Sequence, residues 1–132
     1  MAGIELINVH KQYVVDERPV KVLNGISLKI PEKHITVILG RSGCGKTTTL
    51  RILGGFEHPD TGKVLFDGRD ITDTPPNKRQ LNTVFQKYAL FPHMSIAENI
   101  AFGLKIRGKS KAYIDDKIRY ALKLVNLEGY EY

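Results

Sequence analysis

The sequence predicts an α/β fold, with strands first, then a glycine-rich loop that leads into a helix, then two further helices. Three observations predict it. Apolar and polar residues alternate over much of the first 30 positions, as in strands with one buried face. An apolar run at 35–39 leads into a glycine-rich loop and a helical pattern. The segment 95–125 carries two amphipathic helical stripes.

The first 34 residues are predicted to be mainly antiparallel strands. Ile4, Leu6 and Val9 fall in the first strand, and the polar segment 16–19 ends it. The pattern then predicts two further strands, at 20–23 and 26–30, separated by a turn at Asn24–Gly25.

The apolar run at 35–39 predicts a buried strand, and residues 40–48 after it match the pattern G-x-x-x-x-G-K-[ST]. The glycines allow a tight loop whose backbone amides converge on an anion. A helix starting near Gly45 would present its positive end to the same anion. Gly54–Gly55 predicts the end of this helix.

The loop indicates a nucleoside triphosphate site. Lys46 would reach the β and γ phosphates, and the hydroxyl of Thr47 would ligate Mg²⁺. A plain glycine-rich turn between strand and helix is the alternative, and the agreement of strand, loop and helix disfavours it. The residues expected to contact the phosphates are Gly40, Arg41, Ser42, Gly43, Cys44, Gly45, Lys46, Thr47 and Thr48.

Short elements are predicted after this core. Residues 63–66 form a strand between two turns, and 74–77 form a loop. Residues 84–85 are predicted to start a short buried strand. Residues 86–94 are predicted to form an ordered loop, because they contain a proline and their apolar residues follow no helical or strand periodicity.

Two helices are predicted at the end. Ser95 can cap a helix over 96–104, and Ser110 can cap an amphipathic one. The second helix has one apolar stripe, formed by Ile114, Ile118, Leu122 and Val125.

Composition excludes several classes of protein. At 132 residues and 42% hydrophobic, the chain can bury a core. It has no apolar run near 18 residues and no signal-like N-terminus, so we expect a cytoplasmic protein. The single cysteine, Cys44, excludes an intramolecular disulfide, and a tolerated small residue is its favoured interpretation. The net charge is +6, and the basic run at 105–111 lacks interleaved aromatics, which favours a solvated turn over a nucleic-acid or lipid surface.

A glycine-rich phosphate loop alone does not name the reaction. A GTPase would carry an N-K-x-D motif, which residues 77–80 do not match. It would also carry a D-x-x-G switch, and no aspartate in the chain is followed by glycine three positions later.

The remaining motifs resemble the ATP-binding subunit of ABC transporters along the whole chain. Tyr13 takes the place of the aromatic that stacks on adenine, with Val20 or Val22 beside it. The phosphate loop at 40–48 closely matches the pattern of this family. Gln86, within 83–94, matches the Q-loop glutamine, which in the family helps coordinate Mg²⁺ and the attacking water and links the site to the membrane partner. Taken singly, Tyr13 could be an ordinary strand aromatic and Gln86 a polar loop residue.

The resemblance implies the fold and the site residues. It implies an ABC ATPase core of the P-loop NTPase fold, divided into an antiparallel β part at 1–34, the phosphate-loop core at 35–86, and the Q-loop with part of the helical subdomain at 87–132. The implied cofactors are ATP and Mg²⁺. Lys46 and Gln86 would be catalytic, Thr47 and Gln86 would bind the metal, and Tyr13 and Val22 would hold adenine.

The resemblance also implies partners. Residues 88–94 would receive a transmembrane permease, and a second ATP-binding subunit would complete a homodimer. A solute-binding protein would act indirectly, no nucleic acid is expected, and the permease would hold the chain at the inner face of the cell membrane. Within the family, residues 70–72, 75–79 and 82–86 look like the ATPases of importers for small solutes, most of all spermidine and putrescine.

Several family motifs do not occur in the sequence: the Leu-Ser-Gly-Gly-Gln signature, the Walker B aspartate with its catalytic glutamate, the D-loop and the switch histidine. We therefore expect the N-terminal part of a longer subunit, with an incomplete sheet and with nucleotide binding but little turnover. A stand-alone P-loop nucleotide-binding module and a small-molecule kinase remain alternatives.

Overall fold

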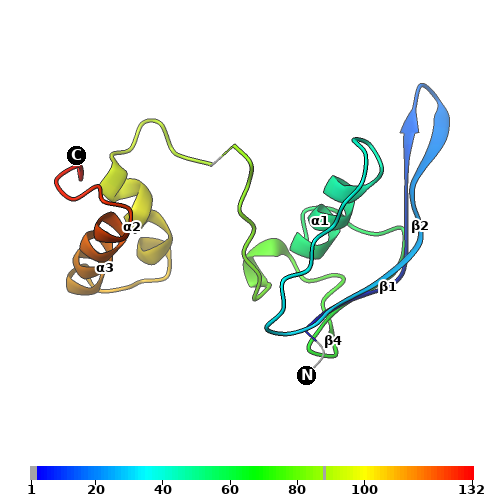
Figure 1. The fold of residues 1–132 in the computed structure, drawn as a ribbon, viewed down its shortest axis with the longest axis horizontal. Helices are drawn as coiled ribbons and strands as arrows, with labels where there is room; N and C mark the ends of the chain where they lie inside the picture. Colours follow the sequence, from blue (N-terminus) through cyan, green and yellow to red (C-terminus); the bar gives the residue numbers. More distant parts are fainter. Residues whose placement is uncertain (1–2, 88) are drawn as a thin grey trace. The chain divides into compact units, whose positions relative to one another are not determined.

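The computed structural model describes residues 3–87 and 89–132. The chain forms two compact units, residues 1–83 and residues 84–132. The first unit holds a sheet and one α-helix, and the second holds two α-helices (Figure 1). Each unit has its own buried residues, so each is described by itself.

The first unit is built on an antiparallel sheet of four strands, in the order β2-β1-β3-β4. Strand β1 spans Ile4–Val15 and β2 spans Arg18–Ile30, and Figure 1 shows them as a long hairpin. Asp16 and Glu17 connect them with φ of 49° and 62°, and two positive φ angles are those of a type I′ turn. The predicted break at 16–19 is confirmed at this turn but not at Arg18 and Pro19, which already belong to β2.

Strand β2 corrects one prediction. Asn24–Gly25 does not separate two strands, because β2 runs through it and Asn24 pairs with His10. Gly25 has a φ of 71°, and the register with β1 shifts between Val9 and His10. A glycine with positive φ suits a β-bulge as well as a turn, and here the local irregularity bends a continuous strand.

The other two strands are shorter. Strand β3 spans Thr61–Phe66, which confirms the strand predicted at 63–66, and β4 spans Arg69–Asp70. β3 pairs with β1, and Leu6 lies opposite Val64 in that register.

Helix α1 spans Lys46–Gly54 and covers the buried face of this sheet. Its C-cap, Gly55, is left-handed with a φ of 82°, as the paired glycines predicted. The fully buried Ile52 and the buried Leu53 carry the apolar face of α1 into the core. The core of the first unit consists of Leu6, Val9, Leu23, Ile52, Leu53 and Val64.

The apolar run at 35–39 is not the buried strand that the sequence predicts. It forms no strand, and Ile35, Val37 and Leu39 expose 95%, 69% and 86% of their surfaces. A strand that is buried on both faces needs neighbours on both edges. No described strand of this chain pairs with 35–39, so its backbone gains no ladder bonds and its side chains stay in water.

Two further predictions differ from the structure. The expected loop at 74–77 contains the start of a short 3₁₀ helix, η1, over Pro76–Lys78. The expected strand at 84–85 is absent, and Val84 exposes 87% of its surface. As at 35–39, no described strand lies beside it to pair with.

The second unit contains α2, Ile96–Ile106, and α3, Lys111–Leu124. Both predicted caps are confirmed: Ser95 forms a reciprocal capping box with Glu98, and the Ser110 hydroxyl accepts from the Tyr113 amide. The helices bury Ala101, Ile114 and Leu122. None of the helices in the described part of the chain is long and apolar enough to cross a bilayer.

Candidate phosphate-binding site

The loop at 40–45 connects the exposed run at 35–39 to α1. The Cys44 amide donates to the Arg41 carbonyl at 3.2 Å, which closes a turn inside the loop. The Lys46 ammonium lies over this turn, donating to the carbonyls of Gly40 and of Arg41, the latter at 3.0 Å. The loop therefore bends back on itself, as its glycines predict.

Gly45 sets the start of α1. It is the N-cap residue with a φ of 95°, and no side chain caps the helix there. A Cβ on Gly45 would lie 2.8 Å from Leu23 Cδ2 and 3.0 Å from the Val22 carbonyl oxygen. Only glycine fits both this conformation and this close contact with β2. The first turn of the helix also contains no acidic residue, so its amides face no competing negative charge there.

A cavity of about 430 Å³ opens at this helix N-terminus. A Cβ on Gly43 would meet nothing within 4 Å, so the loop leaves open space at that position. Seven residues line the cavity: Val22, Ser42, Gly43, Gly45, Lys46, Thr47 and Thr48. All seven are among the predicted site residues, and no carboxylate is among them. Backbone amides, hydroxyls and one ammonium form a surface that is suited to an anion.

The other predicted loop residues contribute differently. The backbone carbonyls of Gly40 and Arg41 hold the Lys46 ammonium, as described above. The Cys44 thiol is exposed, and its Sγ lies 3.9 Å from Lys46 Nζ. A Cβ on Gly40 would lie 2.4 Å from that sulfur, so a side chain at position 40 would require the Cys44 thiol to rotate away.

Tyr13 lies on β1 and does not line the cavity. Its hydroxyl donates to the Glu57 carboxylate at 3.1 Å, and the Lys11 ammonium lies 5.4 Å from its ring centroid. The hydrogen bond from Lys11, with a smaller one from Tyr13, lowers the pKa of Glu57. Burial works against the charged form of Lys11, yet Glu57 and Asp60 together raise its pKa. The role of Tyr13 in adenine binding stays a prediction.

The metal prediction involves Thr47 and Gln86. Thr47 lines the cavity, whereas Gln86 belongs to the second unit and is exposed. The described residues contain no group of three or more His, Cys, Asp or Glu side chains that could hold a metal ion. The Thr47 hydroxyl at the cavity is an oxygen ligand of the kind that Mg²⁺ prefers, and Mg²⁺ in nucleotide sites is held largely by phosphate and water oxygens.

Sequence reasoning missed two residues that hold the structure near the predicted motifs. The Asn99 side chain accepts from the Phe91 amide at 2.8 Å and donates to the carbonyls of Phe91, Met94 and Ser95, so it fixes the end of the predicted Q-loop segment. The Arg79 side chain is buried at the end of α1. The contacts of Asn99 could have been suspected from its position in the first turn of a helix, close to the cap. The burial of Arg79 could not, because an arginine after a proline pair is usually a surface residue.

The sheet, the loop and α1 together define an α/β domain of the P-loop class. A family model for ABC transporters matches residues 23–132. The chain is 57% identical to the spermidine/putrescine import ATP-binding protein PotA of Clostridium novyi and 54% identical to that of Clostridioides difficile, over 97% of this chain. It spans 36% of the length of each of these relatives. The chain belongs to the ABC transporter family.

Solved structures agree with this assignment. The chain is similar to a dimeric, post-hydrolysis structure of the ATP-binding cassette MJ0796 bound to ADP and Pi, with a TM-score of 0.83 and 28% identity. The match covers 97% of this chain and 60% of that one. A second dimeric structure of MJ0796, described as a bacterial ABC transporter cassette, matches with a TM-score of 0.80.

Proposed function

We propose that the chain binds MgATP at the phosphate loop, as part of an ATP-binding subunit of an ABC importer. The observation that carries the proposal is the cavity at the start of α1, lined by Ser42, Gly43, Gly45, Lys46 and Thr47 among others. Its lining has donors and no carboxylate, which suits a polyphosphate. The likeness to a cassette whose structure is bound to ADP and Pi supports the same ligand class.

The chain's own residues divide the task. Backbone amides at 43–48 would hold the β and γ phosphates. The Lys46 ammonium, now on the carbonyls of Gly40 and Arg41, would exchange them for phosphate oxygens, which are stronger acceptors for a cation. Thr47 and Gln86 would ligate Mg²⁺, which supplies charge neutralisation on the phosphates. Tyr13 would stack on the adenine, and Val22, which lines the cavity, would contact the adenine beside it.

Hydrolysis and transport belong to the whole subunit. We propose that a subunit of the relatives' length hydrolyses ATP and couples it to solute import, with a polyamine as the solute because the PotA relatives are named for spermidine and putrescine import. Since none of the described residues that line the cavity is an acid, the chain itself supplies no general base there, and we expect it to bind nucleotide with little turnover.

The partners follow from the same proposal. A second ATP-binding subunit would complete the site, as the dimeric structures of MJ0796 suggest. Residues 88–94 would contact a transmembrane permease, and position 88 lies outside the residues that the structure describes. A solute-binding protein would act through that permease. The subunit would then lie at the inner face of the cell membrane.

Calorimetric titration of the chain with MgATP tests the proposal. Lys46→Ala should weaken binding at least tenfold, because charge-assisted hydrogen bonds contribute about 1.5–3 kcal/mol each. Lys123→Ala, which removes an exposed lysine from α3, is the matched control and should bind as the parent does. Equal affinity of the parent and Lys46→Ala would refute the site.

A further inference from the structure

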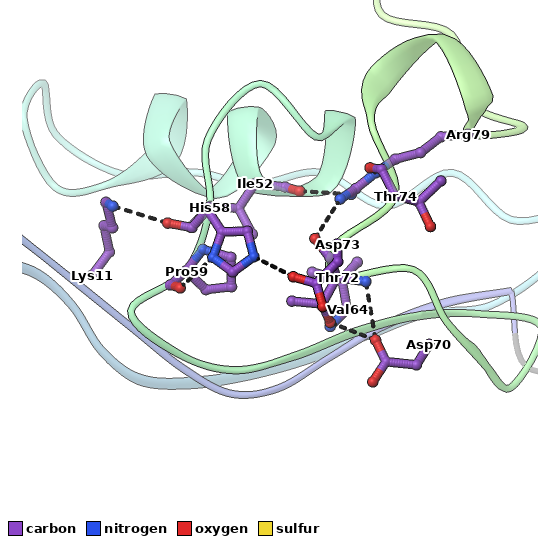
Figure 2. A network of polar contacts seen from close by, with 10 residues as sticks. All are labelled: Lys11, Ile52, His58, Pro59, Val64, Asp70, Thr72, Asp73, Thr74 and Arg79. Atoms are coloured by element: carbon purple, nitrogen blue, oxygen red, sulfur yellow. Dashed lines mark hydrogen bonds and ion pairs between the residues drawn. The ribbon is translucent and has the colours of Figure 1, made fainter.

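The buried Arg79 guanidinium lies at the C-terminal end of α1, at the opposite end of the helix from the phosphate loop. The residue is 8% exposed. Its Nη1 donates to the carbonyls of Ile52 and Leu53, both at 2.9 Å. Its Nε donates to the Thr74 carbonyl at 2.7 Å, and its Nη2 donates to the Thr72 carbonyl at 3.0 Å. Figure 2 shows the guanidinium between the end of the helix and the segment 72–74.

The charge of Arg79 is stabilised without a carboxylate among the described residues. Carbonyls at the end of a helix lack partners within the helix and carry the negative end of its dipole. Burial lowers the pKa of Arg79, and the four carbonyls offset part of that cost. A guanidinium has a planar array of five donors, so it reaches acceptors in several directions, whereas an ammonium is a compact charge with three donors.

Arg79 also connects the helix to the sheet. The Thr72 carbonyl accepts from Arg79, and the Thr72 hydroxyl accepts from the Val64 amide at 2.9 Å. The same hydroxyl donates to Asp70 Oδ1 at 2.6 Å. Val64 is fully buried in β3. Polar contacts therefore run from the last carbonyls of α1, through Arg79 and Thr72, to the central part of the sheet (Figure 2).

The helix end and the guanidinium fit closely. A Cβ on Gly55 would lie 2.6 Å from Arg79 Nε, so the residue after the helix leaves the space that the arginine fills. Gly55 is left-handed, which places its backbone against Arg79 as the chain turns away from α1. This fit leaves little freedom for the C-terminal turn.

We propose that Arg79 is a positioning residue for nucleotide binding: by tying the last carbonyls of α1 to the sheet, it fixes the position of the helix N-terminus that receives the phosphates. A helix of nine residues is about 13 Å long and moves as one body, so an anchor at one end constrains the other. Gly45, close to Leu23 and Val22, is the second point of contact with the sheet. This inference rests on the proposed function.

Two substitutions test the proposal in the full 132-residue chain, Arg79→Met and Arg79→Lys. The measurement is the Kd for MgATP, taken at a temperature where circular dichroism shows each variant folded. Arg79→Met should weaken binding about three- to thirtyfold, the usual range for coupling through a packed element, and Arg79→Lys should weaken it less. The control is Arg51→Met, which removes an exposed arginine from the last turn of the same helix and should change the Kd less than about twofold.

Cys44 gives a second readout, because it is the only cysteine and it is exposed in the phosphate loop. Its rate of alkylation by a maleimide reports the loop directly. We expect Arg79→Met and Arg79→Lys to change this rate without nucleotide, and MgATP to protect the parent at lower concentrations than either variant.

The outcomes are distinct. If the folded Arg79 variants keep the parent's Kd and the parent's Cys44 alkylation rate while their unfolding temperatures fall, Arg79 only stabilises the fold and the proposal is wrong. Should Arg79→Met fail to fold, Arg79→Lys decides the question. Should the parent itself not bind MgATP, the proposed function fails, and the alkylation rate without nucleotide still shows whether Arg79 positions the loop.

Discussion

Two segments of similar length that contain an apolar run, 35–39 and 61–66, have opposite structures. Both were predicted to form strands, wholly or in part. Residues 61–66 form β3, which pairs with β1 and buries Val64 completely. Residues 35–39 form no strand, and Val37 is mostly exposed. Both segments contain an apolar run, but among the described residues only 61–66 has a strand to pair with.

Strand formation is therefore not a local property of a segment. A helix forms its hydrogen bonds within one segment, whereas a strand needs a neighbour that comes from elsewhere in the chain. β1 is long enough to pair with β2 on one edge and β3 on the other. Among the described residues, no strand offers an edge to 35–39. The phosphate loop is thus joined to a well-packed helix on one side and to an unpaired segment on the other.

The largest effect that tests this comparison comes from matched valine substitutions. Val64→Ala should lower the free energy of unfolding by about 2 kcal/mol, because it removes two methyl groups from a filled core. Val37→Ala should change it by less than about 0.5 kcal/mol, as expected at an exposed site. Urea unfolding followed by circular dichroism measures both. Equal losses in the two variants would mean that 35–39 is buried after all.

A smaller effect distinguishes the N-terminal caps of the two helices of the second unit. Ser95 takes part in both hydrogen bonds of a capping box. Its hydroxyl accepts from the Glu98 amide, and the Ser95 amide donates to the Glu98 carboxylate. The hydroxyl of Ser110 accepts from the Tyr113 amide at 3.3 Å, and the described residues show no reciprocal bond to the Ser110 amide. Ser95→Ala should cost about 1 kcal/mol and Ser110→Ala about half of that. Thermal unfolding measures the difference, with Ser95→Thr as the control that keeps the cap; a larger loss for Ser110→Ala would contradict the assignment.

The smallest effect comes from the exposed ion pair between His58 and Asp73, which lie before and after strand β3 in the sequence. His58 Nε2 lies 2.6 Å from Asp73 Oδ1 (Figure 2), and this contact raises the pKa of His58. The folded pKa is above the unfolded one, so the pair stabilises the fold fully below about pH 6.5 and less as the pH rises through the folded pKa.

Since both side chains are mostly exposed, the loss should stay under about 1 kcal/mol. Urea unfolding at several pH values around neutrality measures it, and Asp73→Asn should flatten the profile in that range. An Asp73→Asn profile that keeps the parent's slope would show that another group causes the pH dependence.

The sequence predicted the parts of the molecule that depend on near neighbours. The end of the first strand after Val15 follows from local backbone chemistry. So do the glycine-rich loop from Gly40 and the helix stop at Gly54–Gly55, and α1 begins and ends where these two signals place it. The caps of α2 and α3 belong to the same class.

The remaining features depend on distant contacts. Gly25 allows a turn or a bulge, and only pairing with β1 decides between them. In the sequence Arg79 resembles an ordinary surface arginine, and only the folded structure brings it to the carbonyls at the end of α1. The Tyr13 hydroxyl contacts Glu57, which lies 44 positions away in the sequence. No periodicity or motif reports such contacts.

We expect the amides at 43–48 and the Lys46 ammonium to hold a triphosphate. The decisive experiment is a crystal structure of the chain with Mg²⁺ and a non-hydrolysable ATP analogue. Phosphate oxygens should lie within hydrogen-bond distance of those amides, and Lys46 Nζ should contact the phosphates in place of the carbonyls of Gly40 and Arg41. A nucleotide bound elsewhere, with Lys46 still on its own loop, would contradict this expectation.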